Sequence, residues 1–235
     1  MSGDPRYPWA LRTERWPDDE PLVGPETRAR RFSAPRSLWS DGPWDDEPDE
    51  IHWRHAPSGY PLLMWRNFSG AWCGYVGVPA GHPLHGLGYD NADLCASLPA
   101  HGGLTFAGQF DPRLPSPRRD PAEAGHWWLG FDCSHGFDVM PALEALSTAI
   151  SPDLAAARAR LKRQAGRAGF WTERYMNVTR VRLEVEELAE RVFEAARLST
   201  SVEETLARLG AGARENNENL TERDAPDEST TPRTD

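Results

Sequence analysis

The stretch "WTERYMNVTRVRLEVEELAERVFEAARL" (residues 171–198) decides the fold class of this chain. Its apolar residues recur at steps of three and four, and Glu and Arg fill the other face, which is the pattern of an amphipathic helix with one buried stripe. The stripe consists of Tyr175, Val178, Val181, Val185, Leu188, Val192 and Ala195. A long helix covering another layer is therefore predicted. The same stripe also offers a surface for a homodimer, through pairing with a second copy.

The segments before this helix have the pattern of strands. Four apolar runs are bounded by Gly, Pro, Asn or Asp, and they cover residues 61–68, 71–79, 103–108 and 126–132. Helices are predicted over residues 141–150 and 151–166, with Ser151 as the N-cap of the second, and over residues 201–210. Strands first and helices afterwards predict an α+β fold, a small and mainly antiparallel sheet backed by the long C-terminal helix.

Both ends of the chain differ in composition from the middle. Residues 1–50 are rich in Pro, Asp, Glu and Arg, and their prolines interrupt helices and strand ladders. A mostly disordered arm is predicted there; the alternative is that its tryptophans, at positions 9, 16, 39 and 44, dock onto the core or a partner. Residues 211–235 have almost no large apolar side chain and predict a disordered tail. A single domain over residues 51–210 remains.

Composition excludes several classes of protein. The net charge of −10 argues against a protein that coats nucleic acid, which needs basic patches to displace counterions from phosphates. Three cysteines do not make a disulfide framework and favour a reducing compartment. No apolar run approaches the roughly 18 residues of a membrane span, and the N-terminus has acids and prolines where a signal peptide is apolar. A cytoplasmic protein with no membrane partner is expected.

Chemistry-bearing side chains gather in the middle of the chain. "WWLGFDCSHGFD" (residues 127–138) places Asp132, Cys133, His135 and Asp138 directly after a strand. Two other loops at strand edges carry histidine beside glycine. Since neighbouring strands can bring such loops to one rim, His82, His101 and at least one of Asp132, Cys133 or His135 are expected within one ligand shell.

Two chemistries use these atoms. In the first, His82, His101, Cys133 and His135 are ligands of zinc or another divalent ion. In the second, Cys133 is a nucleophile with a histidine as base and an aspartate that orients it, and the amides of Gly102 and Gly103 hold an oxyanion or phosphate. The catalytic candidates are then His101, Asp132, Cys133, His135 and Asp138. The ordinary alternative is that Asp132 caps a turn, Cys133 is buried and His135 is exposed.

The tandem tryptophans suggest a second use for the same region. In a strand, Trp127 and Trp128 point to opposite faces, so both faces are covered or one tryptophan lines a pocket. Gly130 leaves space for a close approach of another backbone or a ligand. A ring stacked on Trp127 or Trp128 would make the protein a non-catalytic binder of a small, nucleotide-like ligand.

Three motifs in fixed order carry a family resemblance. "GYVGVPAGHPLHG" (74–86), "HGGLTF" (101–106) and "WWLGFDCSHGFD" (127–138), followed by a helix with "LEVEELAERV" (183–192), resemble an uncharacterised family common in bacteriophages and actinobacteria. The resemblance covers about residues 60–195. The positions that match its motifs are His82, His101, Asp132, Cys133, His135 and Asp138. The family implies no activity. By analogy alone, its phage association suggests nucleotide or other small-molecule metabolism, or interference with host signalling.

The function expected from all of this is a hydrolase, with or without a metal, that acts on a small polar substrate such as a nucleotide. The alternative is the non-catalytic small-ligand binder described above.

Overall fold

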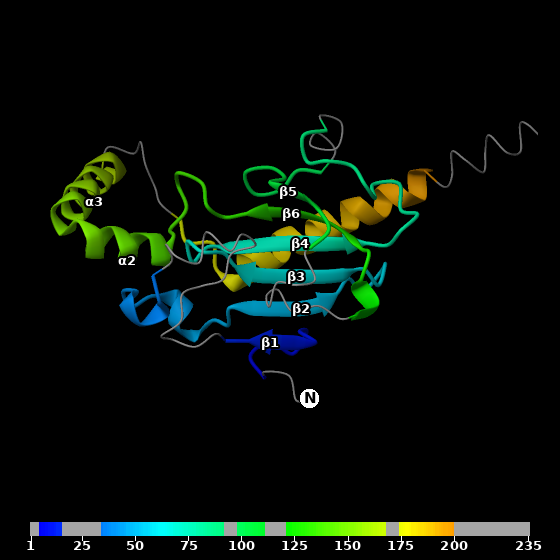
Figure 1. Ribbon diagram of the computed structural model, residues 1–235, viewed down its shortest axis with the longest axis horizontal. Helices are drawn as coiled ribbons and strands as arrows, with labels where there is room; N and C mark the ends of the chain where they lie inside the picture. The colour runs from blue at the N-terminus through cyan, green and yellow to red at the C-terminus, as the bar shows by residue number, and fades with distance from the viewer. Residues whose placement is uncertain (1–4, 16–33, 92–97, 111–120, 168–173, 200–235) are drawn as a thin grey trace, which may run out of the picture. The chain divides into compact units, whose positions relative to one another are not determined.

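A six-stranded antiparallel sheet forms the centre of the protein (Figure 1). The computed structural model describes residues 5–15, 34–91, 98–110, 121–167 and 174–199. The strands are β1 (Arg12–Glu14), β2 (Glu50–Arg54), β3 (Pro61–Arg66), β4 (Trp72–Val78), β5 (Phe106–Gly108) and β6 (Trp127–Asp132), and their order is β1-β2-β3-β4-β6-β5. The helices are α2 (Pro141–Ile150), α3 (Pro152–Arg167) and a C-terminal helix over residues 178–199, with short 3-10 turns at Arg36–Leu38, Pro43–Asp46 and Pro121–Glu123. The predicted α+β fold is confirmed.

The first face of the sheet is covered by the C-terminal helix. Alternate strand residues such as Met64, Trp72 and Val76 point to this face and form one core cluster with Val181 and Val185 of the helix. A Cβ on Gly74 would meet the Val185 side chain at 2.4 Å, so helix and sheet are in tight contact there. Five residues of the apolar stripe expected from the sequence are therefore buried within the chain: Val178, Val181, Val185, Leu188 and Val192.

The second face of the sheet carries a separate aromatic cluster. Leu63, Trp65, Tyr75 and Trp128 point to this face and pack with Phe110. The tyrosine and both tryptophans are almost fully buried. Because successive strand residues alternate in direction, one sheet supplies both clusters.

The four predicted strands are confirmed, but two strands were missed. β2 pairs with β3 along its whole length, and Ile51 and Trp53 point from it into the core. β1 is only three residues long and pairs with β2 at the edge. The strands were missed because β1 is charged and short and because β2 carries only two apolar residues; pairing with a neighbouring strand stabilises both.

The predicted arm over residues 1–50 requires correction. Residues 34–50 are packed against the domain, and Trp39 and Trp44 form a buried cluster with Ala142 of α2. Trp9 lies edge-on against Trp53 at a ring-centroid distance of 5.2 Å. Trp9, Trp39 and Trp44 therefore dock onto the core, as the alternative prediction for this segment states. Trp16 lies outside the described residues. The predicted helix over 201–210 and the tail from 211 also lie outside them.

A buried network of charges ties this N-terminal segment to the sheet and the C-terminal helix. Glu47 accepts hydrogen bonds from Arg66 (2.7 Å), the Trp72 indole (3.0 Å) and the Tyr175 hydroxyl, and its other oxygen accepts from the Val178 amide (2.9 Å). Burial raises the pKa of Tyr175, so its hydroxyl stays protonated and donates. The Val178 amide belongs to the first turn of the helix, where a carboxylate is favoured by the unpaired amides and the helix dipole.

The buried arginines complete the network. Arg66 also donates to the Gly70 carbonyl, and its Nε lies 3.2 Å from Asp49. Arg36 forms an ion pair with the same aspartate and donates to the carbonyls of Trp44 and Glu47. A buried charge is tolerated only when it is paired and hydrogen-bonded, so residues 36–49 are needed to satisfy Arg66.

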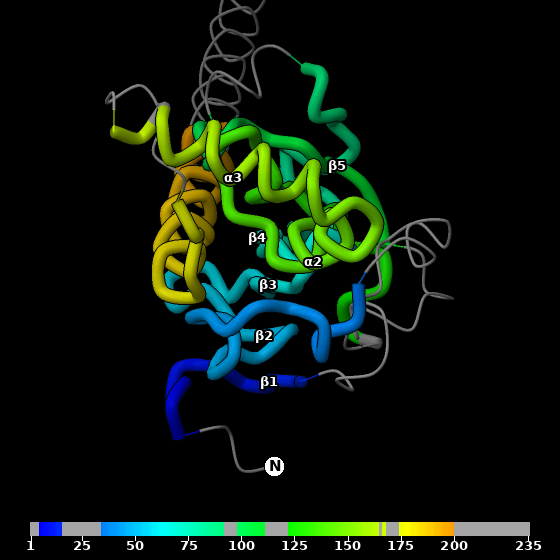
Figure 2. Tube along the Cα trace, turned by 90° about the vertical axis from the view of Figure 1, so that its left-hand side faces the viewer, coloured from blue at the N-terminus to red at the C-terminus, as the bar shows by residue number. Residues whose placement is uncertain are grey.

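The helices after the sheet form a pair. α2 and α3 pack against each other (Figure 2), and α2 also contacts the 3-10 turn at Arg36–Leu38. Both helices were predicted from the sequence and are confirmed. Across the part of the chain that the structure describes, no helix combines the length and the apolar character needed to cross a membrane.

Candidate functional site

Three predicted site residues meet at one end of the sheet. His101 Nε2 lies 3.0 and 2.9 Å from the two carboxylate oxygens of Asp138, and His135 Nδ1 lies 3.2 Å from Asp138 Oδ2. The two imidazole rings are 5.3 Å apart and nearly perpendicular. Within the described residues, this is the one group of His, Cys, Asp and Glu side chains whose ligand atoms lie close enough to hold a metal ion, all within 4.8 Å of one another. We call His101, His135 and Asp138 the triad.

Strand pairing explains why the triad forms. β5 runs antiparallel to β6, and the Thr105 amide donates to the Gly130 carbonyl. The segment that enters β5 therefore lies beside the segment that leaves β6. His101 precedes β5 and His135 follows β6, so 34 positions of sequence separation become direct contact.

The loop after β6 holds Asp138 in place. Its amide donates to the His135 carbonyl, and its carboxylate accepts from the His135 amide at 2.9 Å, which closes a tight turn. Arg174 pairs with the same loop through two backbone hydrogen bonds, to Phe137 and Val139. The carboxylate is fixed by its own turn and by the chain entering the C-terminal helix.

Gly102 places the two histidines against each other. Its φ of +68° lies in the left-handed region that favours glycine. A Cβ at this position would lie 2.0 Å from the His135 ring, so only glycine lets this ring approach the turn. Gly102 therefore acts as a spacer for His135.

The triad combines a buried acid with two accessible bases. The Asp138 side chain is 3% exposed, whereas the His101 and His135 side chains are 21% and 35% exposed. Without a metal, both imidazoles can donate N–H bonds to the carboxylate and form a hydrogen-bonded His–Asp–His group. With a metal, the same three atoms can converge on the ion. Ligands about 2.0–2.2 Å from a tetrahedral ion are about 3.3–3.6 Å apart, so the N···O separations of 2.9 and 3.2 Å must widen when an ion binds.

The expected third loop does not join the triad, and His82 is a correction. His82 follows β4, and Val78 at the end of β4 pairs with Trp127 at the start of β6. His135 follows the opposite end of β6, about 17 Å away for a six-residue strand. His82 is buried beside Tyr60, its Nδ1 accepts from the Leu84 amide, and burial lowers its pKa. It is a buried neutral histidine at the far end of the sheet.

Cys133 and Asp132 are also corrected. Cys133 is 1% exposed and packs in the core cluster under the helix, and burial raises its thiol pKa well above the ordinary value. A thiolate nucleophile or ligand is thus disfavoured, because only the deprotonated sulfur reacts or binds metal. Asp132 accepts from the Ser134 amide at 2.9 Å, and so it caps the turn as in the ordinary alternative.

The residues expected to hold a ligand are occupied by the fold. Trp128 is buried in the second-face cluster, and Trp127 packs against the first-face core and donates its indole N–H to the Leu87 carbonyl. The Tyr75 ring lies over Gly130, which explains the missing side chain there. The Gly103 amide donates to the Ala100 carbonyl, so it is not free for an oxyanion. The interpretation as a stacking binder loses Trp128, which is buried, whereas Trp127 is only partly buried.

One set of positioning residues had no signal in the sequence. Ser134, between Cys133 and His135, accepts a hydrogen bond from the Asn67 side chain at 2.8 Å and lies 3.3 Å from the Ser69 hydroxyl. These contacts anchor the loop of the triad to the turn between β3 and β4. Ser and Asn in turns are ordinary features of a sequence, and only the folded chain shows which loops they join.

Comparisons with known proteins identify no relative. No protein-family model, no curated protein and no solved structure matches this chain.

Proposed function

We propose that the triad binds a divalent transition-metal ion and that the protein is a metal-dependent hydrolase of a small polar substrate such as a nucleotide. The observation that carries the proposal is the convergence of His101 Nε2, His135 Nδ1 and the Asp138 carboxylate within one ligand shell. Two histidines and a carboxylate suit zinc and other first-row ions better than magnesium or calcium, which prefer oxygen ligands.

The number of ligands favours catalysis over a structural role. A structural zinc site has four protein ligands, whereas a catalytic one has three and keeps a position for water, whose pKa the ion lowers to about 7. The triad supplies three, and both of its imidazoles are partly exposed. Water and substrate can therefore reach the ion. The Asp138 carboxylate is buried between the two imidazoles, so it faces the histidines and not the solvent.

Metal binding is the first test of this proposal. The wild-type protein is treated with a chelator and titrated with Zn²⁺, Mn²⁺ and Co²⁺ under native mass spectrometry and calorimetry, and one ion per chain is expected. Loss of a metal ligand lowers metal affinity more than loss of a residue that only supports a ligand. His101→Ala and Asp138→Asn should therefore weaken binding by at least about a hundredfold. His85→Ala is the matched control, because His85 contacts Trp127 at the far end of β6. Equal losses in the control would show that the triad is not the site.

Hydrolysis is the second test. Nucleotides and related phosphoesters are incubated with the metal-loaded protein, and turnover should fall by on the order of a hundredfold or more in His101→Ala. A chelator should remove activity, and the bound ion should restore it. Metal binding without turnover on any of these substrates would overturn the hydrolase proposal and leave a metal-binding protein.

Gly102 provides a sharper test of the geometry. Gly102→Ala places a methyl group against the His135 ring, so we expect metal affinity to fall about tenfold or more while the protein still folds. Gly103→Ala is the control, since Gly103 also has a positive φ, of +91°, but a Cβ there meets no atom within 4 Å. Both variants carry a similar backbone cost of about 1 kcal/mol. A loss of affinity in both would trace the effect to the backbone of the turn and not to His135.

A further inference from the structure

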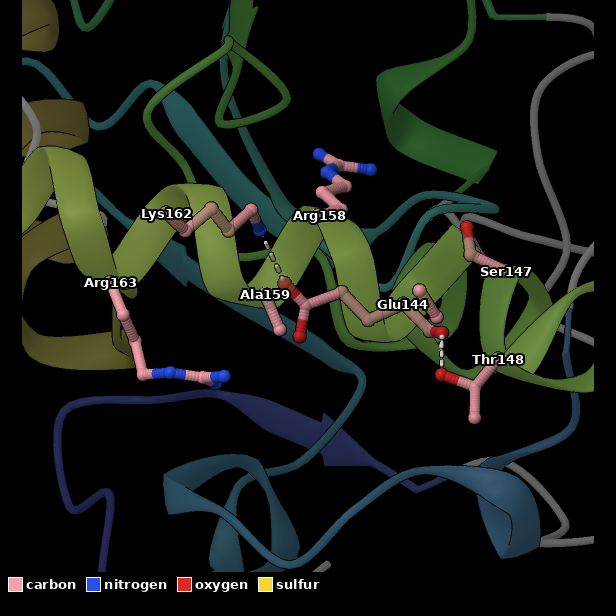
Figure 3. Close-up of a pocket in the computed structure, with 8 residues that line it drawn as sticks. Glu144, Ser147, Thr148, Arg158, Ala159, Lys162 and Arg163 are labelled. Carbon is pink, nitrogen blue, oxygen red and sulfur yellow. Dashed lines mark hydrogen bonds and ion pairs between the residues drawn. The ribbon is translucent and has the colours of Figure 1, made fainter. Parts of the chain in front are cut away.

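A cavity lies away from the triad, between α2 and α3 (Figure 3). Its volume is about 320 Å³, which is at the lower end of the range for small-molecule sites. α2 contributes Glu144, Ser147 and Thr148, and α3 contributes Arg158, Lys162 and Arg163 with two alanines. None of the triad residues lines it. No local sequence pattern indicates this cavity, because its walls come from two separate helices.

The charge of the cavity is opposite to that of the protein. The chain as a whole has a net charge of −10, yet three cations and one carboxylate line the cavity. Glu144 accepts a hydrogen bond from Lys162 at 3.2 Å and neutralises it. In Figure 3 this pair lies between the two helices, and the Arg158 and Arg163 side chains extend on either side of it.

The two arginines are available to a ligand. Both are exposed, and among the described residues neither guanidinium has a hydrogen-bond or ion-pair partner. Their long side chains can rotate toward the cavity at small cost, since no partner has to be released. Ser147 and Thr148 donate to carbonyls of their own helix, so the positive groups dominate the recognition of an anion.

We propose that the cavity between α2 and α3 binds a small ligand that carries phosphate groups, with Arg158 and Arg163 as the residues that contact the phosphates. Guanidinium groups bind phosphate through paired N–H bonds, and two free arginines on either side of the cavity suit a ligand with more than one phosphoryl group. The negative charge of Glu144 repels such a ligand and lowers its affinity. The proposal does not depend on a metal at the triad.

Pyrophosphate is the probe for this site. It is titrated by calorimetry into the full-length, chelator-treated protein at about 0.1 M salt, where charges more than about 10 Å apart are screened. Saturable binding of one pyrophosphate is expected, and Arg158→Gln and Arg163→Gln should each weaken it about tenfold. Arg160→Gln is the matched control, because Arg160 is exposed on the same helix but does not line the cavity.

A second pair of variants tests for an increase in pyrophosphate affinity. Glu144→Gln removes the only carboxylate that lines the cavity, so affinity should rise about threefold or more. Asp153→Asn makes the same charge change on an exposed residue of α3 outside the cavity, and affinity should stay within about twofold. Binding must be unchanged in Asp138→Asn, since capture by a metal at the triad would be lost there. No saturable binding, or equal effects in a variant and its control, would overturn the proposal and indicate at most a diffuse attraction of polyanions to α3.

Discussion

A chain that begins at residue 51 will not show a cooperative unfolding transition. Such a chain lacks β1, Glu47 and Asp49, which satisfy Arg66, and the two tryptophans that pack on α2. An unpaired buried charge costs about 3–5 kcal/mol, and the lost burial of Trp39 and Trp44 adds about 1.5–3 kcal/mol for each. This sum reaches or exceeds about 5 kcal/mol, the lower end of the stability of a whole domain. Thermal and urea unfolding followed by near-UV circular dichroism measure the effect.

A truncation at the other end of the chain is the control for this prediction. A chain that ends at residue 199 keeps the compact unit Met1–Phe193 and should still unfold in one transition. If the chain that begins at residue 51 unfolds cooperatively at the wild-type midpoint, residues 34–50 do not contribute to the stability of the domain.

Glu47→Ala alone should destabilise the protein by about 3–5 kcal/mol. The substitution removes one carboxylate that accepts from Arg66, Trp72, Tyr175 and the amide of Val178. Breaking a buried ion pair costs this much because the other partners keep their desolvation penalty without their hydrogen bonds. Chemical unfolding measures the change as a shift of the urea midpoint at a constant slope.

Two further variants keep this prediction falsifiable if Glu47→Ala does not fold. Glu47→Gln keeps the shape of the side chain and should lose less than Glu47→Ala, because its amide oxygen can still accept hydrogen bonds. Glu187→Ala removes an exposed carboxylate that pairs with Arg191 one helical turn away, and it should change stability by less than about 0.5 kcal/mol. If Glu47→Gln lowers the free energy of unfolding no more than Glu187→Ala does, Glu47 is not the centre of the network.

The sequence predicted those parts of the fold that depend on local periodicity. The stripe from Val178 to Val192 matches the buried face of the C-terminal helix because a period of 3.6 residues is visible in any single helix. The same holds for β3, β4 and β6, whose apolar runs are covered on both faces. For residues 34–50 the composition predicts part of a disordered arm, because proline and charge are typical of disorder. In the folded chain these charges form the buried network around Arg66, which no local pattern can show.

The candidate site was likewise predicted only in part from the sequence. The sequence supplied the chemistry, since it singled out His101, His135 and Asp138 along with His82, Cys133 and Asp132. It could not separate the first three from the others, because the separation depends on which strands are neighbours and in which direction they run. β5 enters where β6 leaves, so His101 meets His135; β4 ends where β6 begins, so His82 lies at the far end. Alternation along the strand turns Cys133 into the core. Residue types and periods are properties of the sequence by itself, whereas the meeting of distant side chains is decided by the tertiary pairing of the strands.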